Sequence, residues 1–447
     1  MPEPLALEIL AATVPDHEAA ILDMRMDGDL AAALEQFAPD IVAVTALTTE
    51  VYAAQAVLAT AKAWSQEVFT AVGGYHATLL PEDFCLPSVD AICLGEGELV
   101  FPRLIEAVVA GRTLQGVPNL VWRGPDGRFV SSGRLFPPLD MNAIPLPRRD
   151  LVAQYRAHYF WLFNKPDSAL ATGRGCPYRC NFCSVWEFYG GRCAQMSVER
   201  VLEELRAVDT THLTFVDDNF LLNHRRDAAL AQAIKAEGIR RRFSMECRTD
   251  SIVRHPELVE QWVDVGLEGV LLGLEGVSDR MLKGVNKHNT ARTNEEAIRI
   301  LRANGVLTWC AFMIDPDWTL DDFQALHDYL SRMDIGFMQF TVLTPLPGTQ
   351  LYRQRKQELL TRDYRCYDTL HAVLPTRLPR EEFYRQYALL YLQPRFAPYY
   401  DLVRRGRLSM EECRRGFQML KTMGRWELYL ENDPVLGDRA KAPIGGC

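Results

Sequence analysis

The sequence predicts an α/β protein with an N-terminal doubly wound parallel sheet, a partial barrel of six strand–helix units and a mainly helical C-terminal region. Short apolar runs alternate with amphipathic stretches of helical spacing over residues 1–135 and again over 166–350. Prolines concentrate at 136–165, which we interpret as an extended linker. A chain of 447 residues is too long for one core, so several domains are expected, the last over 351–447.

In the first domain, buried strands are expected to alternate with helices. The expected helices cover residues 5–12, 29–37, 51–64 and 99–109, and the expected strands cover 19–23, 41–44, 68–72 and 91–94. A Gly-Pro-Asp-Gly stretch at 124–127, between two β-rich segments, predicts a hairpin. Sheets of this kind bind ligands at the carboxyl ends of their strands.

The second set of strands carries polar residues where each strand is expected to end. These strands cover residues 169–172, 212–216, 243–248, 270–275, 307–314 and 337–343. Six such units make a partial barrel, and barrel enzymes place their chemistry at the carboxyl ends of the strands. In the last domain, a helix is expected to start near Glu381.

The loop after the strand at 169–172 contains three cysteines, Cys176, Cys180 and Cys183, in the spacing C-x3-C-x2-C. Thiolates are soft ligands that hold iron–sulfur clusters, and three ligands on a four-iron cluster leave one iron open. Gly175 lets the backbone turn sharply before the first cysteine. A four-cysteine zinc site that includes Cys193 is the alternative, but zinc ribbons usually pair two C-x2-C knuckles.

This cysteine loop, residues 173–183, resembles the signature of radical S-adenosylmethionine (SAM) enzymes. The resemblance implies a [4Fe-4S] cluster on Cys176, Cys180 and Cys183 whose open iron binds SAM. It also implies reductive cleavage of SAM to methionine and a 5′-deoxyadenosyl radical. An aromatic residue before the third cysteine is typical of the family, and Phe182 fits as part of the SAM site.

SAM requires a cation for its carboxylate and acidic acceptors for its ribose and amine. We expect Arg248 to hold the carboxylate, and Glu246 and Glu275 to accept from the ribose or the amine. Asp218 stands where the family often has an amine-binding turn. Each of these residues could instead form a salt bridge at the barrel rim. The sequence assigns no residue to a catalytic step.

The first domain resembles the cobalamin-binding, Rossmann-like domain found upstream of many radical SAM enzymes, because Gly-Gly-x-His precedes Gly-Glu-Gly-Glu. The cobalamin contacts that this implies are Thr45, Thr49, Gly73, Gly74, His76, Gly95, Glu96 and Gly97. We expect His76 to be a turn residue rather than a cobalt ligand. That domain normally opens with a strand, whereas this chain opens almost at the helix over 5–12. The chain starts late, another strand fills the place, or the domain no longer binds cobalamin.

Two further segments, 315–318 and 368–379, are similar to parts of the hopanoid C-3 methylase subgroup of these enzymes. The resemblance implies methylation of an unactivated carbon of a lipid-like or natural-product substrate, with methylcobalamin as the methyl donor. An electron donor of the flavodoxin or ferredoxin type is implied as a partner. Two alternatives stay open: a ring-forming radical enzyme whose cobalamin domain is degenerate, and a non-enzymatic iron–sulfur or zinc regulator.

The composition and charge limit the classes of binding partner and the cellular compartment that we expect for this chain. The net charge of −9 disfavours nucleic-acid binding. No apolar run is long enough to span a membrane, the start lacks the basic region of a signal peptide, and eleven cysteines indicate a reducing cytoplasm. Residues 384–400 could contact a membrane surface, but packing on the barrel is favoured. The tail, 438–447, is expected to be mobile.

Overall fold

A computed structural model describes residues 1–26, 28–333, 335, 337–392, 396–404, 406 and 408–437. The tail that we expected to be mobile and part of the segment 384–400 lie outside these residues. The chain divides into two compact units. Unit 1 contains Met1–Pro177 and Ser184–Asp217, and unit 2 contains Tyr178–Cys183 and Asp218–Cys447. The division therefore passes through the cysteine loop.

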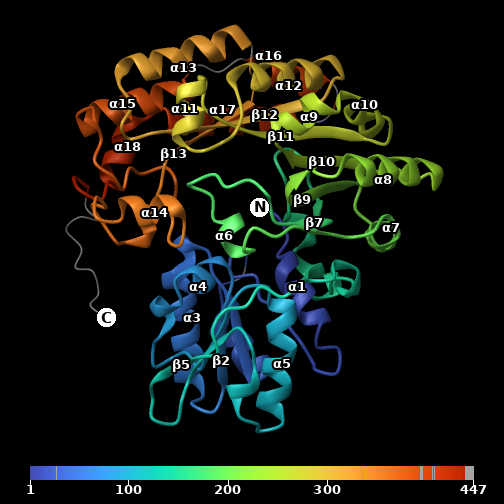
Figure 1. The fold of residues 1–447 in the computed structure, drawn as a ribbon, viewed down its shortest axis with the longest axis vertical. Helices are drawn as coiled ribbons and strands as arrows, with labels where there is room; N and C mark the ends of the chain where they lie inside the picture. Colours follow the sequence, from blue (N-terminus) through green and yellow to red (C-terminus); the bar gives the residue numbers. More distant parts are fainter. Residues whose placement is uncertain are drawn as a thin grey trace. The chain divides into compact units, whose positions relative to one another are not determined.

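The sheet of unit 1 has five strands in the order β1-β2-β3-β4-β5. Figure 1 labels β2 and β5 of this sheet, with α3, α4 and α5 nearby in sequence. The strands are β1 (Ile41–Thr45), β2 (Phe69–Gly73), β3 (Ala91–Cys93), β4 (Leu120–Arg123) and β5 (Phe129–Ser131). The first three are parallel, and β4 and β5 continue the sheet as an antiparallel hairpin. Three expected strands and the expected hairpin are confirmed.

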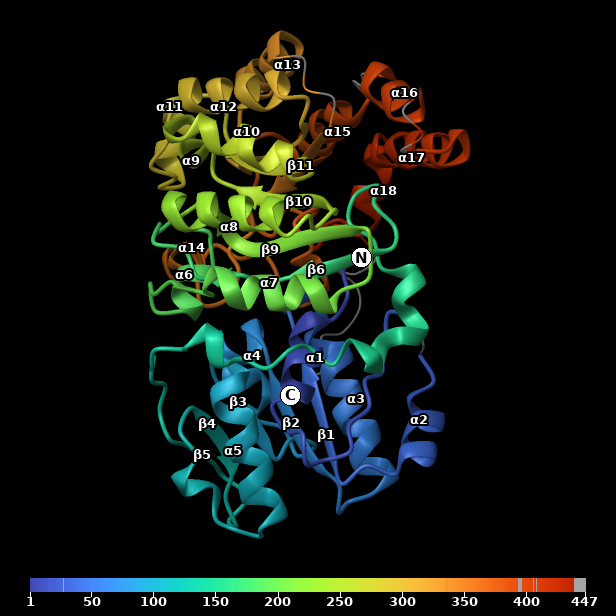
Figure 2. The ribbon, with the colours of Figure 1, turned by 90° about the vertical axis from the view of Figure 1, so that its right-hand side faces the viewer.

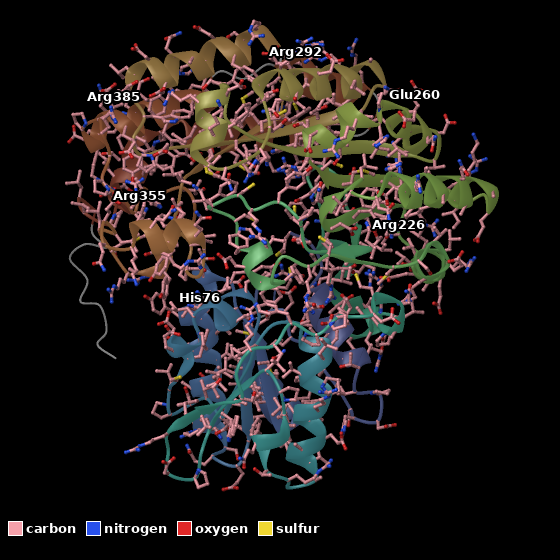
Figure 3. All side chains as sticks on the ribbon, in the orientation of Figure 1. His76, Arg226, Glu260, Arg292, Arg355 and Arg385 are labelled. Atoms are coloured by element: carbon pink, nitrogen blue, oxygen red, sulfur yellow. The ribbon has the colours of Figure 1, made fainter. Side chains whose placement is uncertain are left out.

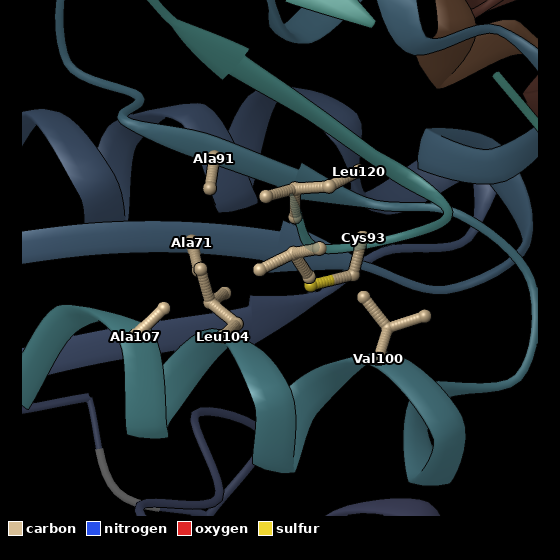
Figure 4. Packing of buried hydrophobic residues seen from close by; sticks show 8 residues of the cluster. Ala71, Ala91, Cys93, Val100, Leu104, Ala107 and Leu120 are labelled. Atoms are coloured by element: carbon tan, nitrogen blue, oxygen red, sulfur yellow. The ribbon is translucent and has the colours of Figure 1, made fainter. Parts of the chain in front are cut away.

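The helices of the N-terminal domain cover this sheet. They are α1 (Leu5–Ala12), α2 (Leu30–Phe37), α3 (Val51–Trp64), α4 (Tyr75–Leu79) and α5 (Gly97–Val109). Figure 4 shows Val100, Leu104 and Ala107 of α5 against the small residues Ala71 and Ala91 of the sheet. Small side chains on the strands let α5 approach closely, so the cluster is dry and close-packed. This packing fixes the start of α5, where the Gly-Glu-Gly-Glu motif lies.

The expected strand over 19–23 is wrong. In a doubly wound sheet of order 2-1-3-4-5, the second strand pairs only with the first. No strand precedes Ile41 in the described residues, and β1 pairs directly with β2, with Ile41 opposite Phe69. Residues 19–23 therefore lack a strand to pair with, and Asp23 instead accepts hydrogen bonds from Arg25 and Tyr159. Among the described residues no other strand pairs with the free side of β1, which is an edge strand.

The second sheet has six strands in the order β13-β12-β11-β10-β9-β6, and Figure 2 shows β6, β9, β10 and β11 in succession. The strands are β6 (Asp167–Leu170), β9 (His212–Phe220), β10 (Arg242–Cys247), β11 (Leu267–Glu275), β12 (Leu307–Ile314) and β13 (Phe337–Val342). The six expected strands are confirmed. Only the strand over 307–314 has both expected limits; β6 begins and ends two residues earlier than expected, and β9 runs to Phe220 and so contains Asp218, which we had placed after the strand.

Helices follow the strands of unit 2. They are α8 (His224–Ala236), α9 (Thr249–Arg254), α10 (Pro256–Asp264), α11 (Asp279–Gly284), α12 (Ala291–Ala303) and α13 (Leu320–Met333). Helix α10 packs on β11 and α12 on β12. The fully buried Trp262 of α10 meets the rings of Phe220 and Phe243 edge-on, which anchors α10 to the sheet.

The C-terminal region is helical as expected. Its helices are α14 (Gln350–Arg355), α15 (Arg380–Tyr391), α16 (Phe396–Arg404), α17 (Met410–Met423) and α18 (Trp426–Glu431). The remaining elements are α6 (Val185–Phe188), α7 (Val198–Ala207), β7 (Gly173–Arg174), β8 (Ala194–Gln195) and the short 3-10 helices η1 (Thr48–Glu50), η2 (Pro81–Phe84), η3 (Leu114–Gly116), η4 (Met141–Ala143), η5 (Arg149–His158) and η6 (Tyr364–Cys366). Among the described helices, none has both the length and the apolar composition needed to cross a membrane.

Candidate functional site

The approach to the first cysteine is fixed in unit 1. Thr172 donates its backbone N–H and its hydroxyl to the carboxylate of Asp217, over 2.7 and 2.8 Å. Strand β7 then pairs with β8. Gly175 has a φ of +80°, and a Cβ there would overlap the carbonyl oxygen of Arg192. Only glycine fits this turn, which delivers the chain to Cys176.

The second half of the cysteine loop, residues 178–183, is fixed in unit 2 by the segment after α11. Asn181 donates its backbone N–H to the carbonyl of Val285 over 3.2 Å and its amide to the carbonyl of Gly284 over 3.0 Å. Asn286 donates in turn to the carbonyl of Arg179. Cys180 is buried, whereas Cys176 and Cys183 are half-buried. These contacts connect the loop at Arg179 and Asn181 to residues 284–286.

Two buried cations, Arg248 and Lys287, lie near Cys180. Arg248 donates from Nε to Asp250 over 2.8 Å and from Nη2 to the carbonyl of Lys287 over 2.8 Å. Lys287 pairs with Glu275, with Nζ 2.8 Å from Oε1. Burial raises the pKa of the Cys180 thiol, and Lys287 and Arg248 act against this rise. The cations therefore favour a thiolate at Cys180.

Several residues around this loop have a left-handed backbone although they are not glycine. Glu275, at the end of β11, has a φ of +63°, and Asn286 and His288 have φ of +54° and +51°. Such conformations cost energy and persist where the surroundings impose them, which is common at functional sites. No periodic pattern in the sequence indicates Lys287, because it lies in a loop between Asn286 and His288.

Two expected SAM contacts, Glu246 and Asp218, lie on the neighbouring strands β10 and β9 of the second sheet. Burial and, after it, the charge of Asp218 raise the pKa of Glu246. Asn219 accepts the backbone N–H of Arg248 over 3.2 Å. The strand ends thus collect acidic groups, with Arg248 at the same edge. Phe182 is half-buried in the cysteine loop.

The donor chemistry of the cysteines suits a four-iron cluster, because thiolates are its usual ligands. The four sulfurs around a zinc ion crowd together, since each Zn–S bond is about 2.3 Å. Each cysteine of a four-iron cluster binds its own iron, so its ligands stand farther apart. Three thiols on a fixed loop beside buried cations fit that group.

The carboxyl ends of β1, β2 and β3 form the corresponding edge of the first sheet. Gly74 has a φ of +94°, and a Cβ there would come within 2.5 Å of the Thr45 hydroxyl. The loops after β1 and β2 therefore interlock closely. Thr45 and Thr49 are exposed, and a Cβ on Gly95 would meet nothing within 4 Å. Exposed threonines and open space at the strand ends leave room for a large planar cofactor.

His76 is buried in α4 and is labelled in Figure 3. Its Nδ1 lies 3.2 Å from the Thr48 hydroxyl, and its Nε2 lies 3.0 Å from a carboxylate oxygen of Asp83. With both nitrogens engaged, the ring holds the neighbouring loops and presents no nitrogen to a metal. Glu96 faces Arg174, with 3.5 Å between Oε2 and Nη1.

Comparisons with known proteins cover both sheets. Residues 2–105 match the B12 binding domain, and residues 170–330 match the radical SAM superfamily. The chain is 32% identical over 393 residues to hopanoid C-3 methylase from Methylococcus capsulatus. The aligned region covers 86% of this chain and 74% of that protein. The chain belongs to the radical SAM enzymes with a B12-binding domain.

This radical SAM enzyme is also 32% identical to an uncharacterized methyltransferase of Pyrococcus horikoshii, over 88% of each chain. Among solved structures, it resembles the cobalamin-dependent SAM radical enzyme OxsB with aqua-cobalamin and SAM bound. That match has a TM-score of 0.72 and 17% identity, and it covers 91% of this chain and 69% of that one. At this identity the likeness shows the fold, and it confirms the expected architecture.

The expected family and cofactors are confirmed. A [4Fe-4S] cluster and SAM belong to a radical SAM enzyme, and cobalamin belongs to its B12-binding domain. The reading as a non-enzymatic regulator is not favoured, because the two relatives at 32% identity are a methylase and an uncharacterized methyltransferase. Motif reasoning missed two residues: Lys287, whose charge acts on Cys180 from outside the motif, and Tyr178, a spacer residue of the loop that packs on Arg248.

Proposed function

We propose that this radical SAM enzyme methylates an unactivated carbon of a small molecule, with cobalamin as the methyl carrier. The observation that carries the proposal is the 32% identity to hopanoid C-3 methylase, which extends through both domains. A polyisoprenoid lipid is the substrate class that this relative suggests. Ring formation without methyl transfer is the alternative reaction, and the experiment below distinguishes it from methylation.

Cys176, Cys180 and Cys183 are the proposed ligands of the cluster. When bound, the cluster and SAM supply a 5′-deoxyadenosyl radical, and cobalamin supplies the methyl group. Lys287 and Arg248 favour the thiolate of Cys180, as the direction of their influence on its pKa supports. Phe182, which is half-buried in the same loop, is a further proposed part of the SAM site.

The proposed SAM contacts are Arg248, Glu275, Glu246 and Asp218. Asp250 and the carbonyl of Lys287 already orient the Arg248 guanidinium, so little side-chain entropy is lost when it meets a carboxylate. The acidic pair on β10 and β9 suits the cationic or hydroxyl groups of SAM. These roles rest on chemistry and position.

For cobalamin we propose direct contacts from the exposed Thr45 and Thr49 and from the open backbone at Gly95. A second set shapes the loops around them, and it consists of Gly73, Gly74, His76, Glu96 and Gly97. The buried, hydrogen-bonded ring of His76 supports a holding role rather than ligation of cobalt.

An electron must reach the cluster before SAM is cleaved. We propose a small ferredoxin or flavodoxin as the donor, and the cytoplasm as the compartment, since the cluster chemistry requires a reducing environment. Contact with a membrane surface is not part of the proposal.

The test uses anaerobically reconstituted enzyme with SAM, reductant, cobalamin and a polyisoprenoid substrate. We expect both 5′-deoxyadenosine and S-adenosylhomocysteine, together with label from the SAM methyl group in the product. Alanine at Cys176, Cys180 or Cys183 should abolish both, whereas alanine at the exposed Cys193 should leave both unchanged. Deoxyadenosine alone would indicate radical chemistry without methyl transfer, and cleavage by the three cysteine variants would contradict the ligand assignment.

A further inference from the structure

The Gly-Glu-Gly-Glu motif of the B12-type domain contacts the cysteine loop within unit 1. Nη2 of Arg174 lies 2.5 Å from Oε1 of Glu98, and Nη1 lies 3.5 Å from Oε2 of Glu96. Arg174 stands two residues before Cys176, and Glu98 stands in the first turn of α5. The motif therefore meets an arginine on the N-terminal flank of the cysteine loop.

This ion pair is withdrawn from water. The Arg174 side chain is 14% exposed and that of Glu98 is 9% exposed. Burial acts to raise the pKa of Glu98, but the charge and hydrogen bond of Arg174 more than offset this and lower it. A desolvated, charge-assisted pair has one preferred geometry, and loss of one partner leaves an uncompensated buried charge. It therefore fixes Arg174 relative to the start of α5.

A second contact holds the C-terminal flank of the loop, also within unit 1. Phe188, five residues after Cys183, stacks on Tyr75, with 4.3 Å between ring centroids and 24° between planes. Tyr75 belongs to the Gly-Gly-Tyr-His motif that follows β2. Arg134 donates to the carbonyls of Glu187 and Phe188, which fixes the same short helix, α6. Stacked rings and two carbonyl hydrogen bonds thus position the chain after Cys183.

The two motifs at the ends of β2 and β3 therefore hold the two flanks of the cysteine loop. We propose that Glu98 and Tyr75 are positioning residues that align the cluster loop with the cobalamin edge of the first sheet. The inference rests on the proposed function and deepens it, because the loops proposed to hold cobalamin also hold the segments around the cysteines. Coupling of SAM cleavage to methyl transfer then depends on these two side chains.

The expected consequence is uncoupling. A reacting group displaced by about 1 Å can lose a hundredfold in rate, so the transfer that needs both cofactors suffers most. Glu98→Gln and Tyr75→Leu should still form 5′-deoxyadenosine, while the ratio of S-adenosylhomocysteine to 5′-deoxyadenosine falls at least tenfold. A purely structural defect would lower both products together and leave their ratio unchanged.

Glu106→Gln is the matched control. Glu106 lies on the same helix and pairs with Arg112, 2.6 Å away, but both side chains are mostly exposed. This variant should keep the wild-type ratio. The double variant Glu98→Met/Arg174→Met removes both buried charges, so it should fold even if Glu98→Gln fails to fold. It should still show the lowered ratio of S-adenosylhomocysteine to 5′-deoxyadenosine.

A spectroscopic measurement tests the positioning without turnover. In reduced, reconstituted enzyme, the magnetic interaction between the [4Fe-4S] cluster and cob(II)alamin broadens their EPR signals according to their separation. We expect altered broadening in Glu98→Gln and Tyr75→Leu at unchanged iron and cobalamin content. Unchanged broadening and an unchanged product ratio would overturn the inference. If wild-type enzyme forms no S-adenosylhomocysteine, the proposed function fails, and the EPR comparison still decides the positioning.

Discussion

The guanidinium of Arg248 lies over the ring of Tyr178, with Cζ 3.5 Å from the ring centroid. The Tyr178 hydroxyl donates to Asp250, which also accepts from Nε of Arg248. Tyr178 stands between the first two cysteines, so a residue of the C-x3-C spacer is fixed by a cation–π contact and a shared carboxylate. The spacer therefore does more than set a distance, because it anchors the loop to the end of β10.

Tyr178→Leu should therefore weaken the hold on the cluster. A cation–π contact contributes about 0.5–2 kcal/mol, and the Asp250 hydrogen bond is lost as well. We expect fewer irons per chain after reconstitution and gel filtration, measured together with acid-labile sulfide. Tyr178→Phe keeps the ring and should retain more iron. Wild-type iron content in the leucine variant would contradict the anchoring role.

Gly74→Ala and Gly95→Ala form a matched pair. Both glycines have positive φ, but only at Gly74 would the new Cβ approach other atoms closely. Strain alone costs about 1 kcal/mol, and the overlap with Thr45 and Ala46 should add about 2 kcal/mol at Gly74. Urea unfolding should show the alanine at 74 as clearly less stable than the alanine at 95. Equal midpoints would show that the loops after β1 and β2 can separate.

Glu8, in α1, should make stability depend on pH. Burial raises its pKa from 4.5 to about 7, with Arg156 opposing the rise and Glu204 adding to it. Between these values the folded state holds a proton that the unfolded state has lost, so the free energy of unfolding falls as pH rises from about 4.5 to about 7. Above that range the penalty is complete and constant.

Glu8→Gln removes this titration. Relative to wild type, the variant should gain about 3 kcal/mol of stability between pH 4.5 and 7.5. Urea unfolding of both proteins at half-unit pH steps measures the difference, in which the contributions of groups that do not interact with Glu8 cancel. A difference that does not change with pH would show that Glu8 is ionised in the folded protein.

Lys287→Met should destabilise unit 2. The Lys287 and Glu275 side chains are 8% and 12% exposed, and removal of one partner from a buried pair costs about 3 kcal/mol. The double variant Lys287→Met/Glu275→Met removes both charges and should recover most of the loss. With Glu275→Met as the second single variant, the free energies of unfolding of the four proteins give the coupling energy, and a Lys287→Met variant as stable as wild type would contradict the prediction.

Local patterns were sufficient for most elements. The helix over 51–64 and the strand over 307–314 match the expected limits, because each has a clear period and clear breakers. The strand expected over 19–23 does not form, although the composition of the segment is apolar. A strand must pair with a neighbouring strand, and no described strand lies beside these residues. At β9, the expected end at Val216 was too early, since β9 runs on through Asp217 to Phe220.

The candidate site likewise contains residues that the sequence predicts and residues that it does not. The cysteine loop could be predicted because its residues are contiguous and their spacing carries the chemistry. The Arg174–Glu98 pair could not, although both residues lie in recognised motifs, because 76 positions separate them. The role of Lys287 becomes visible only when the chain brings the segment after α11 to the loop, and that of Tyr178 only when Arg248 and Asp250, after β10, lie beside it. Long-range pairing is a property of the fold that no local window contains.

The division of the chain into compact units bears on how such enzymes can be recombined. Residues Ser184–Asp217 lie beyond the cysteines in sequence, yet they pack in the same unit as the N-terminal sheet. In a chimera joined in the linker, Glu98 and Tyr75 would come from the foreign B12-type domain. Arg174 and Phe188 would come from the host, where they pair with the host's own residues. A graft that includes both members of the Glu98–Arg174 and Tyr75–Phe188 pairs would transfer the domain together with the contacts that hold the flanks of the cysteine loop.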